Sequence, residues 1–134
     1  MALAHGVGIE IEAKTLADHV RVTCTGAFTL DAAIQVFRRT FELAADAGRE
    51  AALLDLRGLS GAPTLTERYE IAVRAAEFQA ARKPRVRLAV LGNEPLIHPE
   101  RFGEIVATTR GAVGRVFTDE ALALQWLLGS AREP

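Results

Sequence analysis

Hydrophobic residues in this chain recur every two positions in some segments and every three to four in others, and this alternation limits the fold class more than any other feature. At 7–11 and 20–24, apolar and polar residues alternate, which predicts two strands with one buried face each. The short polar connector at 14–18 suits an antiparallel hairpin between them. Across 30–44 the apolar spacing becomes helical, and Gly48 stands where a helix places its C-terminal glycine.

The middle of the chain continues this alternation. The nearly continuous apolar run AALLDL at 51–56 is typical of a strand that is buried on both faces near the centre of a sheet. Thr64 and Glu67 have the spacing of a capping box, which predicts that a second helix begins there and ends before Pro84. Residues 86–90 again follow a strand pattern. The stripe predicted to face inward from the second helix consists of Leu65, Tyr69, Ala72, Val73, Ala76 and Ala80.

The last third of the chain predicts a helix, a short strand and a final helix. Pro99 fits the first turn of the third helix, and Gly111 fits its end. A strand is expected at 113–117, and Thr118 can cap the last helix. The predicted inner stripe of the third helix is Phe102, Ile105, Val106 and Thr109, and the residues expected to pack the last helix are Leu122, Leu124, Trp126 and Leu128.

These elements follow one another in the order β-β-α-β-α-β-α-β-α. Strands that alternate with helices of this length predict an α/β fold with right-handed crossovers, here a mixed, mainly parallel five-stranded sheet. The polar outer faces of the first two strands indicate that one face of the sheet is incompletely covered there. At 134 residues with no linker-like segment, 1–134 is expected to be a single domain.

Composition argues against several classes of function. Sixteen basic and 17 acidic residues give a net charge of −1, which argues against a nucleic-acid-binding protein. No stretch approaches the ~20 apolar residues of a membrane span, and the N-terminal residues lack the pattern of a secretory signal. The single Cys24 cannot form an internal disulfide. We therefore expect a cytoplasmic protein without stable membrane insertion.

Three segments carry a resemblance to a known family: GAFTLDAA at 26–33, LDLRG at 54–58, and the last helix with EAL at 120–122 and WL at 126–127. In their order and spacing they resemble the STAS superfamily, especially its bacterial SpoIIAA-like (STAS/SEC14-type) stand-alone proteins. The resemblance spans nearly the whole chain. It implies strands in near-sequential order, helices mostly on one face of the sheet, and a regulatory module that binds a protein partner.

The phosphorylation motif of that superfamily is missing from this chain. In the phosphoswitch members, an Asp-Ser-Ser-Gly motif opens the helix after the central strand, and here Pro-Thr-Leu-Thr occupies 63–66. Thr64 and Thr66 keep hydroxyl groups at this point. Each is therefore either a helix cap or a phospho-acceptor, since a phosphate at a helix N-terminus gains from free N–H groups. The capping-box spacing favours the cap.

Candidate catalytic and metal-binding residues are few. Cys24 is predicted to point into the core, where a thiol is an inert small hydrophobe. The three histidines, His5, His19 and His98, lie far apart without metal-ligand spacing, so no metal and no cofactor is expected. Asp55 interrupts the apolar central strand.

Two of these residues leave a ligand-binding alternative open. We expect Asp55 to accept hydrogen bonds from N–H groups near Gly58 or Gly92, with a ligand contact as the alternative. His98 precedes a helix at the edge where open α/β sheets bind ligands, although a solvent-exposed loop is the simpler interpretation. An enzyme that uses Asp55 and His98 is disfavoured, because no nucleophile–base pair accompanies them.

The second helix carries a further apolar cluster away from its predicted inner stripe, formed by Ile71, Ala75 and Phe78. Either a neighbouring helix covers this cluster, or it is exposed and binds a protein partner or a second copy in a homodimer. Together with the resemblance, the sequence favours a non-enzymatic regulatory or protein-interaction module. The alternative is a carrier of an apolar or lipid-like small ligand, because the related SEC14-type folds bind lipids.

Overall fold

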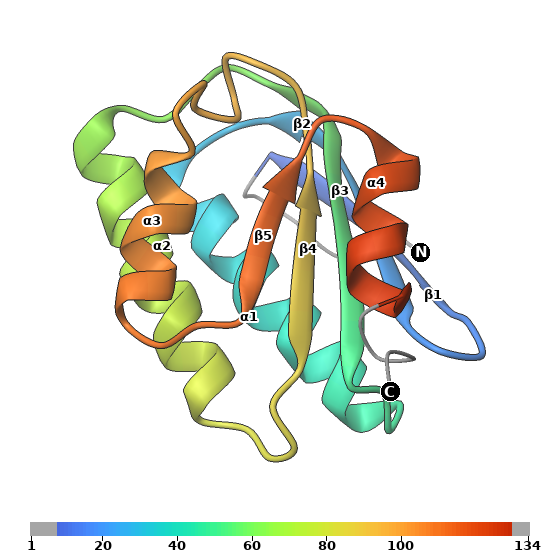
Figure 1. The fold of residues 1–134 in the computed structure, drawn as a ribbon. Helices are drawn as coiled ribbons and strands as arrows, with labels where there is room; N and C mark the ends of the chain where they lie inside the picture. The colour runs from blue at the N-terminus through green and yellow to red at the C-terminus, as the bar shows by residue number, and fades with distance from the viewer. Residues whose placement is uncertain (1–7, 130–134) are drawn as a thin grey trace.

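The computed structural model describes residues 8–129, which form a five-stranded sheet between two layers of helices (Figure 1). The strands stand in sequential order; β1 is antiparallel to β2, and all other neighbours are parallel. The predicted α/β class and the mixed, mainly parallel sheet are confirmed. The elements are β1 (Ile9–Thr15), β2 (Val20–Ala27), α1 (Leu30–Asp46), β3 (Ala51–Ser60), α2 (Leu65–Ala80), β4 (Arg87–Leu91), α3 (Phe102–Thr109), β5 (Gly114–Phe117), α4 (Glu120–Leu124) and the π-helical turn η1 (Gln125–Gly129).

The hairpin of β1 and β2 is antiparallel, as the alternating pattern predicts. Its register pairs Ile9 with Gly26 and Thr15 with Val20. Gly26 has a φ of 129°, and a Cβ atom at this position would lie 2.0 Å from the carbonyl oxygen of Gly8. The segments around Gly8 and Gly26 approach each other so closely that glycine is required at position 26.

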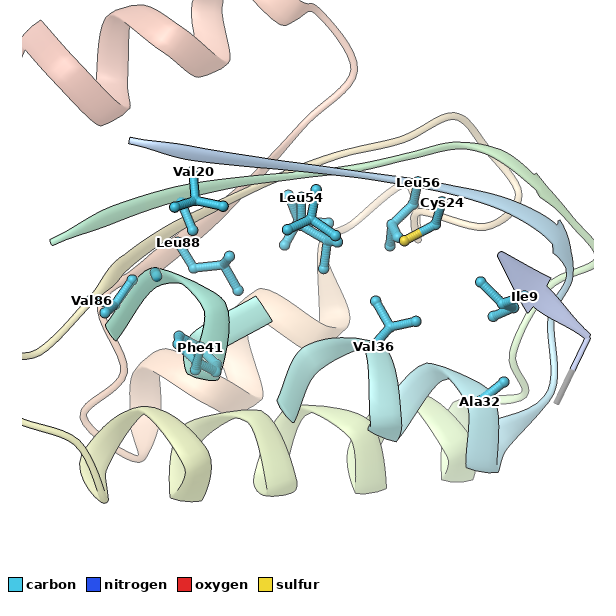
Figure 2. Packing of buried hydrophobic residues seen from close by; sticks show 14 of the residues in the cluster. Ile9, Val20, Cys24, Ala32, Val36, Phe41, Leu54, Leu56, Val86 and Leu88 are labelled. Atoms are coloured by element: carbon cyan, nitrogen blue, oxygen red, sulfur yellow. The ribbon is translucent and has the colours of Figure 1, made fainter. Parts of the chain in front are cut away.

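The main core lies between the sheet and α1. The helix begins at Thr29, whose side chain accepts a hydrogen bond from the backbone N–H of Ala32. Figure 2 shows Val36 and Phe41 of α1 on the side of the sheet where Leu54 projects. Because helical and strand periodicities both present their apolar residues to this one layer, most of these side chains are buried.

The central position predicted for β3 is confirmed, because β3 pairs with β2 on one side and with β4 on the other. Its side chains alternate between two cores. Leu54 and Leu56 belong to the main core, whereas Leu53 belongs to a smaller core beneath α4 and η1. Three helices thus share one face of the sheet, and the α4–η1 segment covers part of the other (Figure 1).

The second helix begins at the predicted capping box, and its buried face includes Ala72 and Ala76 of the predicted stripe but not the large side chains. Leu65 and Tyr69 were predicted to face inward and are 56% and 45% exposed. The prediction is wrong because α2 packs mainly against α1 and α3 and not on the sheet. The residues that α2 buries are Ala72, Ala75, Ala76 and Gln79.

The third helix is shorter and rotated relative to its prediction. Pro99 lies in a turn before the helix, and Arg101, with a φ of 57°, is the residue at which the helix starts. Ile105, a member of the predicted inner stripe, is 56% exposed. Phe102 and Val106 of that stripe are half-buried, but Ile105 and Thr109 are exposed, because α3 also turns Gly103, Glu104 and Ala107 toward the cavity described below.

The last helix also begins one residue later than expected. Asp119, and not Thr118, is the cap, since its side chain accepts a hydrogen bond from the N–H of Leu122. Leu122 itself is 55% exposed, which corrects its predicted packing role. The buried residues of this segment are Ala123 and Leu127, with Leu124, Trp126 and Leu128 packed partly against them. A small side chain at 123 lets the short helix approach the sheet closely.

Candidate functional site

The carboxylate of Asp55 is buried and fully engaged by two arginines. Its two oxygens accept from Nε and Nη2 of Arg57 at 3.0 and 2.9 Å, from the Arg57 backbone N–H at 3.0 Å, and from Nη2 of Arg21 at 2.8 Å. The backbone N–H of Arg57 is the donor expected near Gly58, whereas the guanidinium donors of Arg57 and Arg21 were not expected. The side chain points to the α4 side of the sheet, where arginines of β2 and β3 reach it.

Glu120, in the first turn of α4, completes this group of charges. It accepts from Nη1 of Arg21 at 2.9 Å and from Nη2 of Arg57 at 2.8 Å. Two arginines thus face two carboxylates and the group has no net charge. We call these four residues, Arg21, Asp55, Arg57 and Glu120, the charge cluster.

The charge cluster keeps both carboxylates ionised. Burial alone raises the pKa of Asp55, but hydrogen bonds from Arg57 and the charges of Arg57 and Arg21 outweigh burial, so its pKa is lowered. The hydrogen bond from Arg21 is the largest cause of the lowered pKa of Glu120. A carboxylate that is held ionised by four donors is a poor general base, and the cluster anchors α4 on the sheet.

The other candidates for catalysis or metal binding are not assembled into a site. Cys24 is 0% exposed, and its burial raises the pKa of the thiol to about 12, so it stays protonated. His19 is buried in the β1–β2 turn beside Asp18. Within residues 8–129 no group of three or more metal-ligating side chains exists, and His5 lies outside the described residues.

His98 and Asp55 do not meet. His98 lies in the loop after β4, where Nδ1 accepts from the backbone N–H of Glu100 at 3.0 Å and the ring packs on Phe102 with centroids 6.1 Å apart. It faces the α1–α3 side, whereas Asp55 faces α4. The structure therefore separates the two residues that the sequence placed at one ligand edge.

Thr64 and Thr66 differ in what their hydroxyl groups do. Thr64 Oγ1 accepts from the N–H of Glu67 at 3.1 Å, and Glu67 Oε1 accepts from the N–H of Thr64 at 2.9 Å, so both halves of the capping box are made. Both threonines are exposed. A phosphate on Thr64 would stand against the Glu67 carboxylate and displace the cap.

A cavity of about 150 Å³ lies between the sheet and the three helices that share its face. The surface of its walls is almost wholly apolar, although Arg68, Arg101 and Glu104 are among the lining residues, which come mainly from α1, α2, α3, β3, β4 and β5. Ile71 and Ala75 line it from α2, and Leu96 and Ile97 close it from the loop after β4. It exists because α2, rich in alanine along its inner face, spans the gap between α1 and α3 without filling it.

The cluster Ile71, Ala75 and Phe78 is largely inside the molecule. Ala75 is 8% exposed, Phe78 packs against the main core, and Ile71 lines the cavity. The large apolar side chains that α2 and α3 present to solvent are instead Leu65, Tyr69 and Ile105. We call these three residues the outer apolar surface. Tyr69 also accepts a hydrogen bond from Arg110 at 2.6 Å.

Asp55 was a candidate site residue from the sequence alone, but its partners in the charge cluster, Arg21, Arg57 and Glu120, were not. Arg21 is 34 residues from Asp55, and Glu120 is 99 residues from Arg21. The one signal available was that Arg21 stands on the polar face of an alternating strand while Glu120 stands at the start of a helix. No helix within residues 8–129 combines the length and the hydropathy that crossing a membrane requires.

Comparisons with solved structures place the fold. An anti-sigma factor antagonist from Mycobacterium paratuberculosis superposes with a TM-score of 0.60 at 11% identity, over 93% of this chain and 98% of that one. An uncharacterised DUF3478-family protein with a SpoIIAA-like fold from Shewanella loihica PV-4 gives a TM-score of 0.49 at 22% identity, over 90% and 93%. No family model and no curated protein sequence matches the chain. The STAS-like resemblance is thus confirmed at the level of the fold.

Proposed function

We propose that the protein is a non-enzymatic regulatory module that binds a protein partner through the outer apolar surface of α2 and α3. The observation that carries this proposal is the exposure of Leu65, Tyr69 and Ile105 on two neighbouring helices. Exposed apolar side chains that gather on one side of a molecule commonly mark interaction sites. The fold shared with an anti-sigma factor antagonist supports a protein partner.

This surface is distinct from the cluster of Ile71, Ala75 and Phe78, for which the sequence left open either coverage by a neighbouring helix or exposure to a partner. Ala75 is only 8% exposed, and Phe78 packs against the main core, so neither offers a partner a large exposed side chain. The charged substitutions Ile71→Asp and Phe78→Asp should destabilise the fold, so a loss of binding in these variants would not identify the docking surface. The partner is either another protein or a second copy of this chain. We retain the cytoplasm as the proposed location and propose no nucleic-acid partner.

The absence of catalysis is part of the proposal. The negative charge of Asp55 is compensated by ion pairs with Arg21 and Arg57, and the Cys24 thiol is buried and protonated. Neither group has the exposure and the adjacent base that a nucleophile needs. Thr64 is proposed to act as a helix cap in this module, and Thr66 remains the hydroxyl available for modification.

The test compares three aspartate variants of equally exposed apolar residues. Leu65→Asp and Ile105→Asp should each weaken capture of the partner by about tenfold or more, whereas Leu122→Asp on α4 should leave it unchanged. Sedimentation velocity of the same variants separates a homodimer from a foreign partner. If all three variants bind and associate as the parent does, the outer apolar surface is not the docking site.

A second candidate function, the carrier of a small apolar ligand, is favoured by the cavity. A cavity of about 150 Å³ with apolar walls is of the size that holds a benzene-sized molecule. It is too small for a whole lipid tail, which narrows the ligand expected from the sequence. Filling it tests the idea: Ala75→Leu should abolish binding of small apolar probes, and Ala80→Leu, exposed on the same helix, should not.

A further inference from the structure

We propose that the cavity selects a small monocarboxylate, with its apolar body inside and its carboxylate on the guanidinium of Arg68. This inference rests on the carrier candidate and adds the chemical class of the ligand. The relevant observations are the unused donors of Arg68, the excess positive charge around the cavity, and the size of the cavity.

Arg68 is positioned by the protein but only partly used by it. It lies in the first turns of α2 and lines the cavity. Nη1 donates to the carbonyl oxygen of Leu96 at 2.6 Å, and Nη2 donates to that of Pro95 at 2.7 Å. A guanidinium has five N–H donors, so three have no acceptor among residues 8–129. The two carbonyl contacts fix the plane of the group and leave the remaining donors for a ligand.

The positive charge of Arg68 is not compensated by the part of the chain that the structure describes. None of its carboxylates forms an ion pair with Arg68, and burial lowers the pKa of the guanidinium. Arg101, which is exposed, also lines the cavity, whereas the guanidinium of Arg115 lies over the Phe117 ring and does not contribute its charge there. The one carboxylate there, Glu104, accepts from the N–H of Val116 at 2.9 Å. We therefore expect the ligand of this cavity to carry a negative charge.

Size and polarity restrict the rest of the ligand. About 150 Å³ admits a body of roughly six carbon atoms. Gln79 also lines the cavity. Its amide donates to the carbonyl oxygens of Val86 and Val113 and accepts from the Val113 N–H, so these groups are not available to hydrogen-bond a ligand. A single charge is favoured over a double one, because the desolvation cost grows with charge. A planar carboxylate also matches the fork of an arginine.

The experiment measures binding of hexanoate and hexan-1-ol, which share a six-carbon body, by isothermal titration calorimetry. Hexanoate should bind about tenfold or more tightly than the alcohol. Arg68→Met keeps the apolar stem and should remove this preference, whereas Arg68→Lys should keep part of it. Arg74→Met, on the same helix but outside the cavity walls, is the matched control and should behave as the parent protein. Circular dichroism establishes that each variant is folded.

The outcomes separate this inference from the carrier function. Equal binding of the acid and the alcohol, or a preference that survives Arg68→Met, overturns the carboxylate inference and leaves the carrier intact. If neither compound binds the folded parent protein, both are overturned. If the parent protein and Arg74→Met bind hexanoate more tightly than hexan-1-ol but Arg68→Met does not, Arg68 is the residue that recognises the carboxylate.

Discussion

Asp55 carries a buried carboxylate that four donors from Arg21 and Arg57 engage. A carboxylate inside an apolar strand must find such donors. Which donors it finds depends on the register of β2 against β3, which pairs Thr23 with Asp55 and so brings Arg21 alongside. That register is a property of the assembled sheet, and no local pattern encodes it.

The charge cluster predicts an acid-sensitive stability. The pKa values of Asp55 and Glu120 are lower in the folded protein than in the unfolded chain, so their contribution is complete above the ordinary carboxyl pKa and is lost as the pH falls through the folded values. Urea denaturation should therefore show stability falling below about pH 5. In Asp55→Asn this fall should be smaller. An unchanged pH dependence in that variant would contradict the assignment.

Gln79 is a second residue whose role follows only from the structure. Its amide donates to the carbonyl oxygens of Val86 and Val113 at 2.6 and 2.9 Å and accepts from the Val113 N–H at 2.9 Å. It thereby ties the end of α2 to the segments that lead into β4 and β5. The helical pattern indicated only a polar position near the end of α2.

Replacing this amide should be costly. Gln79→Met preserves volume but leaves the Val86 carbonyl and the Val113 N–H without partners, whereas the Val113 carbonyl keeps the N–H of Leu88. The free energy of unfolding should therefore fall by about 2 kcal/mol. Gln35→Met, at an exposed position on α1, should change it by less than about 0.5 kcal/mol. Thermal or urea denaturation measures both, and equal effects of the two substitutions would count against the proposed role of Gln79.

At the scale of elements, the residues at which helices begin and end were more predictable than the face that each helix buries. The capping box at Thr64 and the glycines after α1 and α3 are local signals, and each helix boundary they predict is present. The inward face is not local. Because α2 packs against helices and not on the sheet, its buried stripe follows its alanines, and Leu65 and Tyr69 turn outward.

The capping box supplies a matched pair of substitutions. Thr64→Ala removes the acceptor for the Glu67 N–H and should lower the free energy of unfolding by about 1 kcal/mol. Thr66→Ala, two residues away and exposed, removes a hydroxyl with no hydrogen bond among the described residues and should have little effect. Chemical denaturation of the two variants measures the difference. A larger loss from Thr66→Ala would mean that the cap assignment is wrong.

At the scale of the whole molecule, the order of elements determined the sheet and its crossovers, and the sequence predicted both. The cavity could not be predicted in this way. It is the difference between the space that three helices enclose and the volume of the side chains they place there, and a periodic pattern reports neither quantity. The same packing displaces apolar side chains of α2 and α3 to the surface, so one arrangement produces both candidate sites.

The central claim is that a protein partner binds on the α2–α3 side, and site-specific photo-crosslinking in the native host tests it most directly. A photoreactive phenylalanine analogue replaces Leu65 in one strain and Leu122 in another; these residues are 56% and 55% exposed, on opposite faces of the sheet. We expect one discrete crosslinked adduct with a partner protein from position 65 and none from position 122. An adduct from position 122 alone, or none from either, would contradict it.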